Sequence, residues 1–266
     1  MIDLHLHLLP DVDDGASSVE DSHAMIARAK ELGFTNLIAT PHLEGVLTPE
    51  YLAAIEAGAN AVDPIAAQYG VEVGLGFENR LTPDIPARLE RGEPITLDGS
   101  MTVLVELPFA GWPLHTEQTL FNIQAAGFRA LLAHPERYAT FQDDPDRALD
   151  LAERGVLMQV TTGALVGLFG RAAQRLAEEL LVQDAVAVLA TDAHSDGQRL
   201  TSVTAGLERA RRLVGEERVR QLTVDNPRAI LDDKPLPTPA EIRPEAEPTN
   251  GWRQALRRLT ARAGFV

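Results

Sequence analysis

Cysteine is absent from all 266 residues of the chain. The protein therefore cannot form a disulfide, and mechanisms that need a thiolate nucleophile, including those of the cysteine-dependent phosphatases, are excluded. Metal sites that use sulfur are excluded as well, so any metal ion would be bound by histidine, aspartate and glutamate. A composition without cysteine is also typical of a reducing compartment, and we predict a cytoplasmic location.

Long apolar runs and basic residues are scarce too. No run of about 18 apolar residues occurs, so we expect no membrane-spanning helix. We also expect no signal peptide, because the N-terminus has neither a basic region nor an apolar one. The 39 acidic residues outnumber the 24 basic ones and give a formal net charge of −15. Such a charge argues against nucleic acid as a partner and favours the attraction of divalent cations.

The first fifteen residues combine a strand pattern with side chains that bind metals. Apolar residues at the even positions of 2–8 alternate with polar ones, which is the periodicity of a β-strand. His5 and His7 are two residues apart, so on a strand they face the same side and can bind one ion. An acidic loop that contains Asp14 and ends at Gly15 follows. Two solvated histidines on a surface strand would give the same pattern, so the interpretation depends on the rest of the chain.

Strand and helix patterns alternate about seven times after this segment. The further predicted strands are 36–40, 71–77, 102–105, 129–133, 156–160 and 185–190. Alternation of this kind predicts an α/β fold with a parallel sheet and helical crossovers. An open, doubly wound sheet and a closed barrel both fit. We favour the TIM-like barrel, because polar residues end nearly every strand and a barrel gathers those ends around one mouth.

The sequence predicts where one helix begins and where it is interrupted. Thr48-Pro49 is a favourable N-cap and first-turn pair, so a helix is predicted to begin there. We expect this helix to break or restart at Asp63-Pro64, because proline lacks the backbone N–H that an α-helix needs.

Nine potential metal ligands share one feature, which is a place at or just after the end of a predicted strand. They are His5, His7, Asp14, His42, Glu78, Glu106, His134, Asp192 and His194. Nine nitrogen and oxygen ligands are too many for one ion, and they suit two or three ions of manganese, iron or zinc. Paired ions about 3.5–4 Å apart are typical of phosphoester hydrolysis. Amide hydrolysis is the second interpretation, because binuclear amidohydrolases also use barrels.

Short motifs then connect the chain to a known group of enzymes. The segments DLHLH, DVDDG, ATPH, AHPERY and TDAH resemble the PHP (polymerase and histidinol phosphatase) superfamily. DVDDG and HPERY narrow the resemblance to the protein-tyrosine phosphatases of bacterial capsule and exopolysaccharide operons, over about residues 1–231. The resemblance implies a distorted (β/α)7 barrel with a manganese-preferring centre of three ions, whereas the ligand count alone allows two to three Mn²⁺ ions.

The same resemblance implies a role for each residue of the pattern. It assigns three groups to three ions: His5, His7, Glu78 and Asp192; then Glu78 again, as a bridge, with Glu106 and His134; then Asp14, His42 and His194. Arg137, in HPERY, and Arg199, five residues after His194, match phosphate-binding arginines. A planar guanidinium binds two phosphate oxygens at once, so both its charge and its shape suit this role. The other interpretation of Arg137 is a salt bridge to Glu136 or a neighbour.

The function that follows is a metal-dependent phosphomonoester hydrolase. By resemblance, its substrate is phosphotyrosine on a bacterial tyrosine kinase of capsule or exopolysaccharide biosynthesis. A small-molecule phosphatase, such as one for histidinol phosphate, is the alternative, and a non-catalytic regulatory module is the third. Phe109, Trp112 and Tyr138 follow strand ends, so they either stack on a phenyl ring or pack the top of the barrel.

The last part of the chain differs in composition. We predict a phosphatase barrel over 1–233, a linker rich in proline and glutamate over 234–250, and a basic amphipathic helix over 251–266. Three interpretations of the helix remain: it packs on the acidic barrel, it makes peripheral contact with an anionic membrane, or it is a disordered end.

Overall fold

Strands and helices alternate along the part of the chain that the computed structural model describes, residues 1–236. The tail helix predicted over 251–266 and all but the first three residues of the predicted linker lie outside the described residues. Within 1–236 the strands are β1 (Ile2–Leu6), β2 (Asn36–Ala39), β3 (His42–Leu43), β4 (Glu72–Leu75), β5 (Glu78–Arg80), β6 (Thr102–Glu106), β7 (Arg129–Ala133), β8 (Leu157–Thr161) and β9 (Val186–Ala190).

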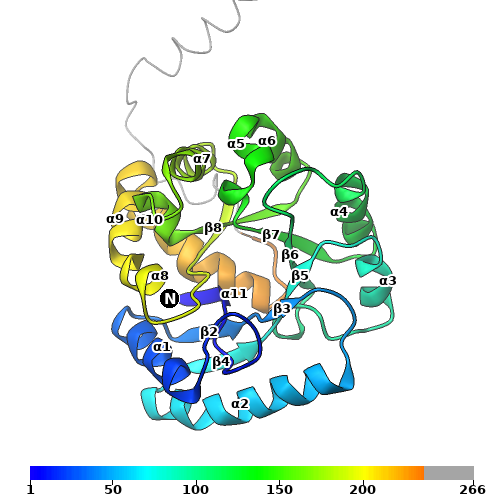
Figure 1. The fold of residues 1–266 in the computed structure, drawn as a ribbon. Coiled ribbons are helices and arrows are strands. Elements are labelled where there is room, and N and C mark those ends of the chain that lie inside the picture. Colours follow the sequence, from blue (N-terminus) through cyan, green and yellow to red (C-terminus); the bar gives the residue numbers. More distant parts are fainter. Residues whose placement is uncertain (237–266) are drawn as a thin grey trace, which may run out of the picture. The chain divides into compact units, whose positions relative to one another are not determined.

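Helices connect these strands and surround them (Figure 1). They are α1 (Val19–Glu31), α2 (Pro49–Tyr69), α3 (Ile85–Glu90), α4 (Thr116–Ala125), α5 (Ala139–Asp143), α6 (Pro145–Glu153), α7 (Arg171–Val182), α8 (Gln198–Thr201), α9 (Val203–Val214), α10 (Glu216–Arg220) and α11 (Asn226–Leu231). In residues 1–236 no helix is both long enough and apolar enough to cross a bilayer.

All strand pairs of the two described sheets are parallel, as the alternating pattern predicts. One sheet has the order β1-β2-β4, and the other has the order β3-β5-β6-β7-β8-β9. Backbone hydrogen bonds also connect the end of β1 to the segment after β9, from Asp192 N to His5 O and from His7 N to Ala193 O, each at 2.8 Å. The carboxyl ends of strands far apart in sequence therefore meet.

Two of the predicted strands are each followed, after a short break, by a second strand that belongs to the other sheet. The strand predicted over 36–40 is β2, and after Pro41 the chain enters the second sheet as β3. The strand predicted over 71–77 is β4, and β5 follows after Gly76. Pro41 cannot donate a ladder hydrogen bond. A Cβ on Gly76 would lie 2.8 Å from the Leu97 side chain and 3.2 Å from Leu97 Cα, so the close approach of this segment favours glycine.

The prediction that α2 breaks at Asp63-Pro64 is wrong. The helix runs without interruption from Pro49 to Tyr69, and the Thr48 hydroxyl caps it by accepting a hydrogen bond from Tyr51 N at 3.2 Å. Pro64 lies on the exposed face, whereas Val62 and Ala66 are buried on either side of it. Water can therefore solvate the carbonyl that proline leaves without a partner, while burial of the opposite face holds the helix together.

The apolar core lies between the sheets and the helices around them. Strands β6, β7 and β9 are buried along almost their whole length, as expected for parallel strands covered on both sides. At the amino ends of the strands, Ile230 of α11 packs with Ile2 and Leu4 of β1 in a second cluster. Apolar packing thus fills the strand layer, and polar side chains gather at the opposite, carboxyl ends.

Candidate metal centre

All nine predicted ligands come together at the carboxyl ends of the strands, and we call them the ligand cluster. Strand β1 carries His5, and the other eight lie at strand termini or in the loops that follow: His7, Asp14, His42, Glu78, Glu106, His134, Asp192 and His194. Four groups of three or four of these residues have ligand atoms within 4.8 Å of one another, and together they include all nine.

Glu78 lies at the middle of the ligand cluster and contacts four imidazoles. Its Oε2 is 3.3 Å from the Nε2 atoms of His5 and His7 and 3.1 Å from Nδ1 of His42. Its Oε1 accepts a hydrogen bond from His134 Nε2 at 2.8 Å. Burial raises the pKa of this carboxyl, but the surrounding histidines outweigh burial and hold the pKa well below its usual value. A carboxylate with both oxygens engaged is suited to bridge two ions.

Asp192 completes the inner part of the ligand cluster. Its Oδ1 lies 3.4 Å from His5 Nε2 and 3.5 Å from His7 Nε2, and those two nitrogens are 3.4 Å apart. Two imidazole nitrogens and two carboxylate oxygens, the second from Glu78, thus surround one point. This arrangement agrees with the first of the three predicted groups.

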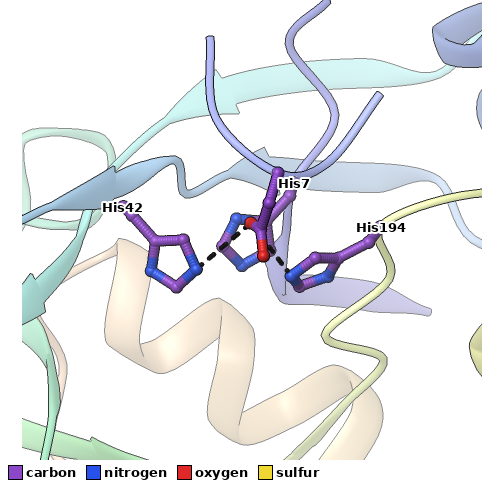
Figure 2. A group of neighbouring side chains, drawn as sticks. His7, His42 and His194 are labelled. Atoms are coloured by element: carbon purple, nitrogen blue, oxygen red, sulfur yellow. Dashed lines mark ion pairs between the residues drawn. The ribbon is translucent and has the colours of Figure 1, made fainter. Parts of the chain in front are cut away.

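An outer group faces solvent. Asp14 Oδ1 lies 3.3 Å from His42 Nε2 and 3.4 Å from His194 Nε2, and the Asp14 side chain is 67% exposed. His7 belongs to the same group, and Figure 2 shows the rings of His7, His42 and His194 turned toward one another. Asp14, His42 and His194 therefore lie together, and His7 is shared between this group and the inner one.

The two remaining residues, His134 and Glu106, each lie beside Glu78. His134 groups with His5 and Glu78, whereas Glu106 groups with His42 and Glu78. His134 Nε2 is 3.8 Å from Glu106 Oε1, so the two lie near each other without forming one tight group. Burial, together with the charge of Glu78, raises the pKa of Glu106 to about 7. Two carboxylates that repel each other at a buried site, next to imidazoles, fit divalent cations well.

Two side chains outside the ligand cluster orient its histidines. The Nδ1 of His7 donates to Asp13 Oδ2 at 2.6 Å, and the Nδ1 of His5 donates to Gln159 Oε1 at 2.7 Å. These bonds fix each ring so that its Nε2 faces the centre, as in many metal sites. Sequence reasoning missed both residues. The DVDDG motif could have indicated Asp13, but nothing in the sequence signals that Gln159 of β8 faces His5.

Backbone geometry at the site is also specialised. His134 and Asp192 have φ values of 33° and 51°, in the left-handed region that residues other than glycine rarely adopt. A Cβ on Gly15 would lie 2.3 Å from His7 O and 2.4 Å from His7 Cβ. The acidic loop can therefore fold back onto His7 only because residue 15 is glycine.

Both predicted phosphate-binding arginines border the ligand cluster. Arg137 Nη1 and Arg199 Nη1 lie 2.7 Å and 2.8 Å from the same oxygen, Asp192 Oδ2. The alternative salt bridge of Arg137 therefore exists with Asp192 and not with Glu136, because Glu136 is buried and accepts a hydrogen bond from Thr161 N at 3.0 Å. Two guanidiniums thus lie directly beside the ligand cluster.

The three aromatic residues proposed for ring stacking separate into two kinds. Tyr138 is buried, and its hydroxyl oxygen accepts a hydrogen bond from Leu107 N at 3.0 Å. The Trp112 ring stacks against Arg147, whose guanidinium carbon lies 4.3 Å from the ring centroid. Phe109 is 46% exposed and lies 4.6 Å from the Arg137 guanidinium. Tyr138 therefore packs the end of the strand layer, and of the three only Phe109 borders the ligand cluster with exposed surface.

Comparison with known proteins gives consistent results. The family model described as capsular polysaccharide synthesis, CpsB/CapC, matches residues 1–232. Tyrosine-protein phosphatase YwqE of Bacillus subtilis is 31% identical over 197 residues, which cover 73% of this chain and 78% of that protein. Tyrosine-protein phosphatase CpsB of Streptococcus pneumoniae is 29% identical over 247 residues, or 88% of this chain and 99% of its own.

A solved structure has a similar fold. It comes from the metal-dependent tyrosine phosphatases YwqE of Bacillus subtilis and CpsB of Streptococcus pneumoniae, and superposes with a TM-score of 0.81 at 28% identity. The superposition covers 94% of this chain and 100% of the other.

Proposed function

The chain belongs to the CpsB/CapC family of capsular polysaccharide synthesis, and we propose that it is a metal-dependent tyrosine-protein phosphatase. The observation that carries the proposal is the ligand cluster with two arginines against it. Five imidazoles and four carboxylates without any thiolate leave hydrolysis by a metal-assisted route as the chemistry that fits.

The metal content is the first part of the proposal. Two to three Mn²⁺ ions would be held by the nine residues of the ligand cluster, with Glu78 as a bridge, and iron and zinc are alternatives. Such ions, when bound, lower the pKa of water and neutralise charge on a phosphoryl group. Asp13 and Gln159 hold the histidine rings in place for them.

The two arginines would bind the phosphoryl group. Arg137 and Arg199 point toward one oxygen of Asp192, so their remaining N–H groups can donate to phosphoryl oxygens next to it. Charge that develops on those oxygens in the transition state would then meet fixed cations, which is usually a large part of catalysis.

The finer fold is also part of the proposal. Strands β2 and β3 count as one interrupted strand, as do β4 and β5, which leaves seven. Hydrogen bonds between β1 and the segment after β9 support closure of these seven strands into a distorted (β/α)7 barrel. Such a barrel would extend over about 1–233, and its mouth would hold the ligand cluster.

The substrate we propose is phosphotyrosine on a bacterial tyrosine kinase of capsule or exopolysaccharide biosynthesis. The names of the relatives and of the family support it. Exposure of Asp14 leaves the outer group open to a side chain presented by another protein. The cytoplasmic location and the three-part division of the chain stay predictions.

A substrate panel tests the function. Full-length protein loaded with Mn²⁺ should hydrolyse phosphotyrosine peptides more efficiently than phosphoserine peptides, histidinol phosphate or sugar phosphates, and should contain two to three ions per chain. A higher kcat/KM for histidinol phosphate would establish the small-molecule alternative. If no phosphomonoester is hydrolysed despite full metal content, the remaining interpretation is a non-catalytic regulatory module.

A further inference from the structure

Phe169 lies against both arginines of the proposed phosphate site. Its ring centroid is 4.7 Å from the Arg137 guanidinium carbon and 5.5 Å from that of Arg199. The two arginines come from separate segments, one following β7 and the other in α8. Among residues 1–236, no other aromatic ring is recorded beside both guanidiniums.

The backbone around Phe169 is built to hold it in place. Gly167 and Gly170 bracket it with φ values of 83° and 90°, a conformation that favours glycine. Gly167 N donates to Ala164 O, and Gly170 N donates to Gly167 O, each at 3.0 Å. Two consecutive tight turns thus present the ring at a defined place.

The geometry explains why a ring is useful there. Both guanidiniums approach one carboxylate oxygen of Asp192, so two positive charges lie close together and repel each other. The face of an aromatic ring carries negative charge and attracts cations. A guanidinium that stacks on a ring keeps its N–H groups at the edge, where they remain free to bind phosphate oxygens. A ring can therefore hold both arginines without using their donors.

A solvent-accessible cavity reaches the same place. It has a volume of about 410 Å³ and its lining is Leu168, Phe169, His194, Ser195, Gln198 and Arg199. Because one wall belongs to the ligand cluster and another to Arg199, an anion entering the cavity can meet both.

We propose that Phe169 is a positioning residue of the phosphate site, holding Arg137 and Arg199 in the orientation that binds the phosphoryl group. This role rests on the proposed function, since it assumes that the arginines bind phosphate. Phe109 covers Arg137 on its own, so it contributes to one arginine and not to the pair.

The test compares three variants of the full-length, Mn²⁺-loaded enzyme with p-nitrophenyl phosphate as substrate and inorganic phosphate as inhibitor. Phe169→Leu should raise KM and the inhibition constant of phosphate by about tenfold, the effect expected when two cation–π contacts are lost together. Phe169→Tyr keeps the ring and should restore both constants. Phe121→Leu removes a 62% exposed ring of α4 and should change neither. Metal content should be the same in all three.

A double-mutant cycle separates positioning from packing. In an Arg199→Ala background one of the two contacts is already gone, so Phe169→Leu should raise the phosphate inhibition constant by only about threefold. An equal effect in both backgrounds, or equal impairment of Phe169→Leu and Phe169→Tyr, would overturn the positioning role. An unmodified enzyme without phosphatase activity would instead overturn the proposed function.

Discussion

Replacing Asp13 with asparagine removes one negative charge next to His7 and changes little else in shape. Asp13 accepts three hydrogen bonds: from His7 Nδ1 at 2.6 Å, from His42 N at 3.0 Å and from Gly15 N at 3.0 Å. Burial raises the pKa of this carboxyl, but the hydrogen bonds, led by that from His7, outweigh burial and leave the pKa below its usual value. Asp13 is thus ionised at neutral pH and is a strong acceptor for the His7 ring.

The expected loss follows from that bond. A hydrogen bond to a charged group contributes about 1.5–3 kcal/mol, and part of this remains because an amide oxygen can still accept from His7. The amide has only one oxygen, so it cannot also serve both backbone N–H groups. Loss of a carboxylate that orients a metal-binding histidine typically lowers metal affinity by about 10- to 100-fold. We expect a value in this range for Asp13→Asn, because His7 contributes to both the inner and the outer group.

Activity measured against free Mn²⁺ concentration, together with calorimetric titration of metal-free protein, gives the affinity. Asp11→Asn is the matched control, since Asp11 lies in the same loop, is exposed, and loses the same charge. We expect Asp11→Asn to shift the Mn²⁺ concentration for half-maximal activity by less than about threefold, because an exposed charge is screened. Equal shifts in the two variants would refute the reasoning, since they would mean that loop charge matters and orientation of His7 does not.

Three further predictions concern the same site. Arg137→Ala should lower kcat on p-nitrophenyl phosphate by about 10²-fold at unchanged metal content, the typical loss when one transition-state donor is removed; unchanged activity would make Arg137 structural. Gly15→Ala should lower both the melting temperature and Mn²⁺ affinity, because its Cβ would lie 2.3 Å from His7 O; a variant that equals the unmodified protein in both measurements would contradict the crowding. Iodoacetamide should leave activity intact, because the chain has no cysteine, whereas a chelator should abolish activity until Mn²⁺ is restored; inactivation by iodoacetamide would reveal a contaminating enzyme.

The sequence predicted the parallel α/β fold and the residues that meet at the strand ends. This succeeded because parallel strands share a direction, so residues at their carboxyl ends come together whatever the path of the helices. His5 and Asp192 are 187 positions apart, yet their side-chain atoms lie 3.4 Å from each other. The alternation of apolar and polar residues located the strands. Because the strands are parallel, the residues at their carboxyl ends then lie on one side of the fold.

The failures concern places where tertiary packing outweighs a local signal. Pro64 did not end α2, because the buried face of that helix continues past it. Helix α5 was not predicted, since only five residues form it and no apolar repeat of that length can be recognised. The π-helical turn over Gln221–Asp225 was not predicted either, because sequence patterns do not reveal such a turn.

Contacts between side chains from distant segments could not be predicted from the sequence. Gln159 fixes the ring of His5 from a strand 154 residues away, and Phe169 reaches two arginines through a pair of glycine turns. The Gln159 contact depends on the register between strands that are distant in sequence, because a register shifted by one residue would place its side chain on the opposite face. The Phe169 contacts depend on the path of the loop between β8 and α7. Which side chains meet at the strand ends can thus be predicted from one chain, whereas ring orientation and arginine geometry follow only from the folded structure. Metal affinity and phosphate binding should therefore respond to changes at Gln159 and Phe169 even though neither residue belongs to any recognisable motif.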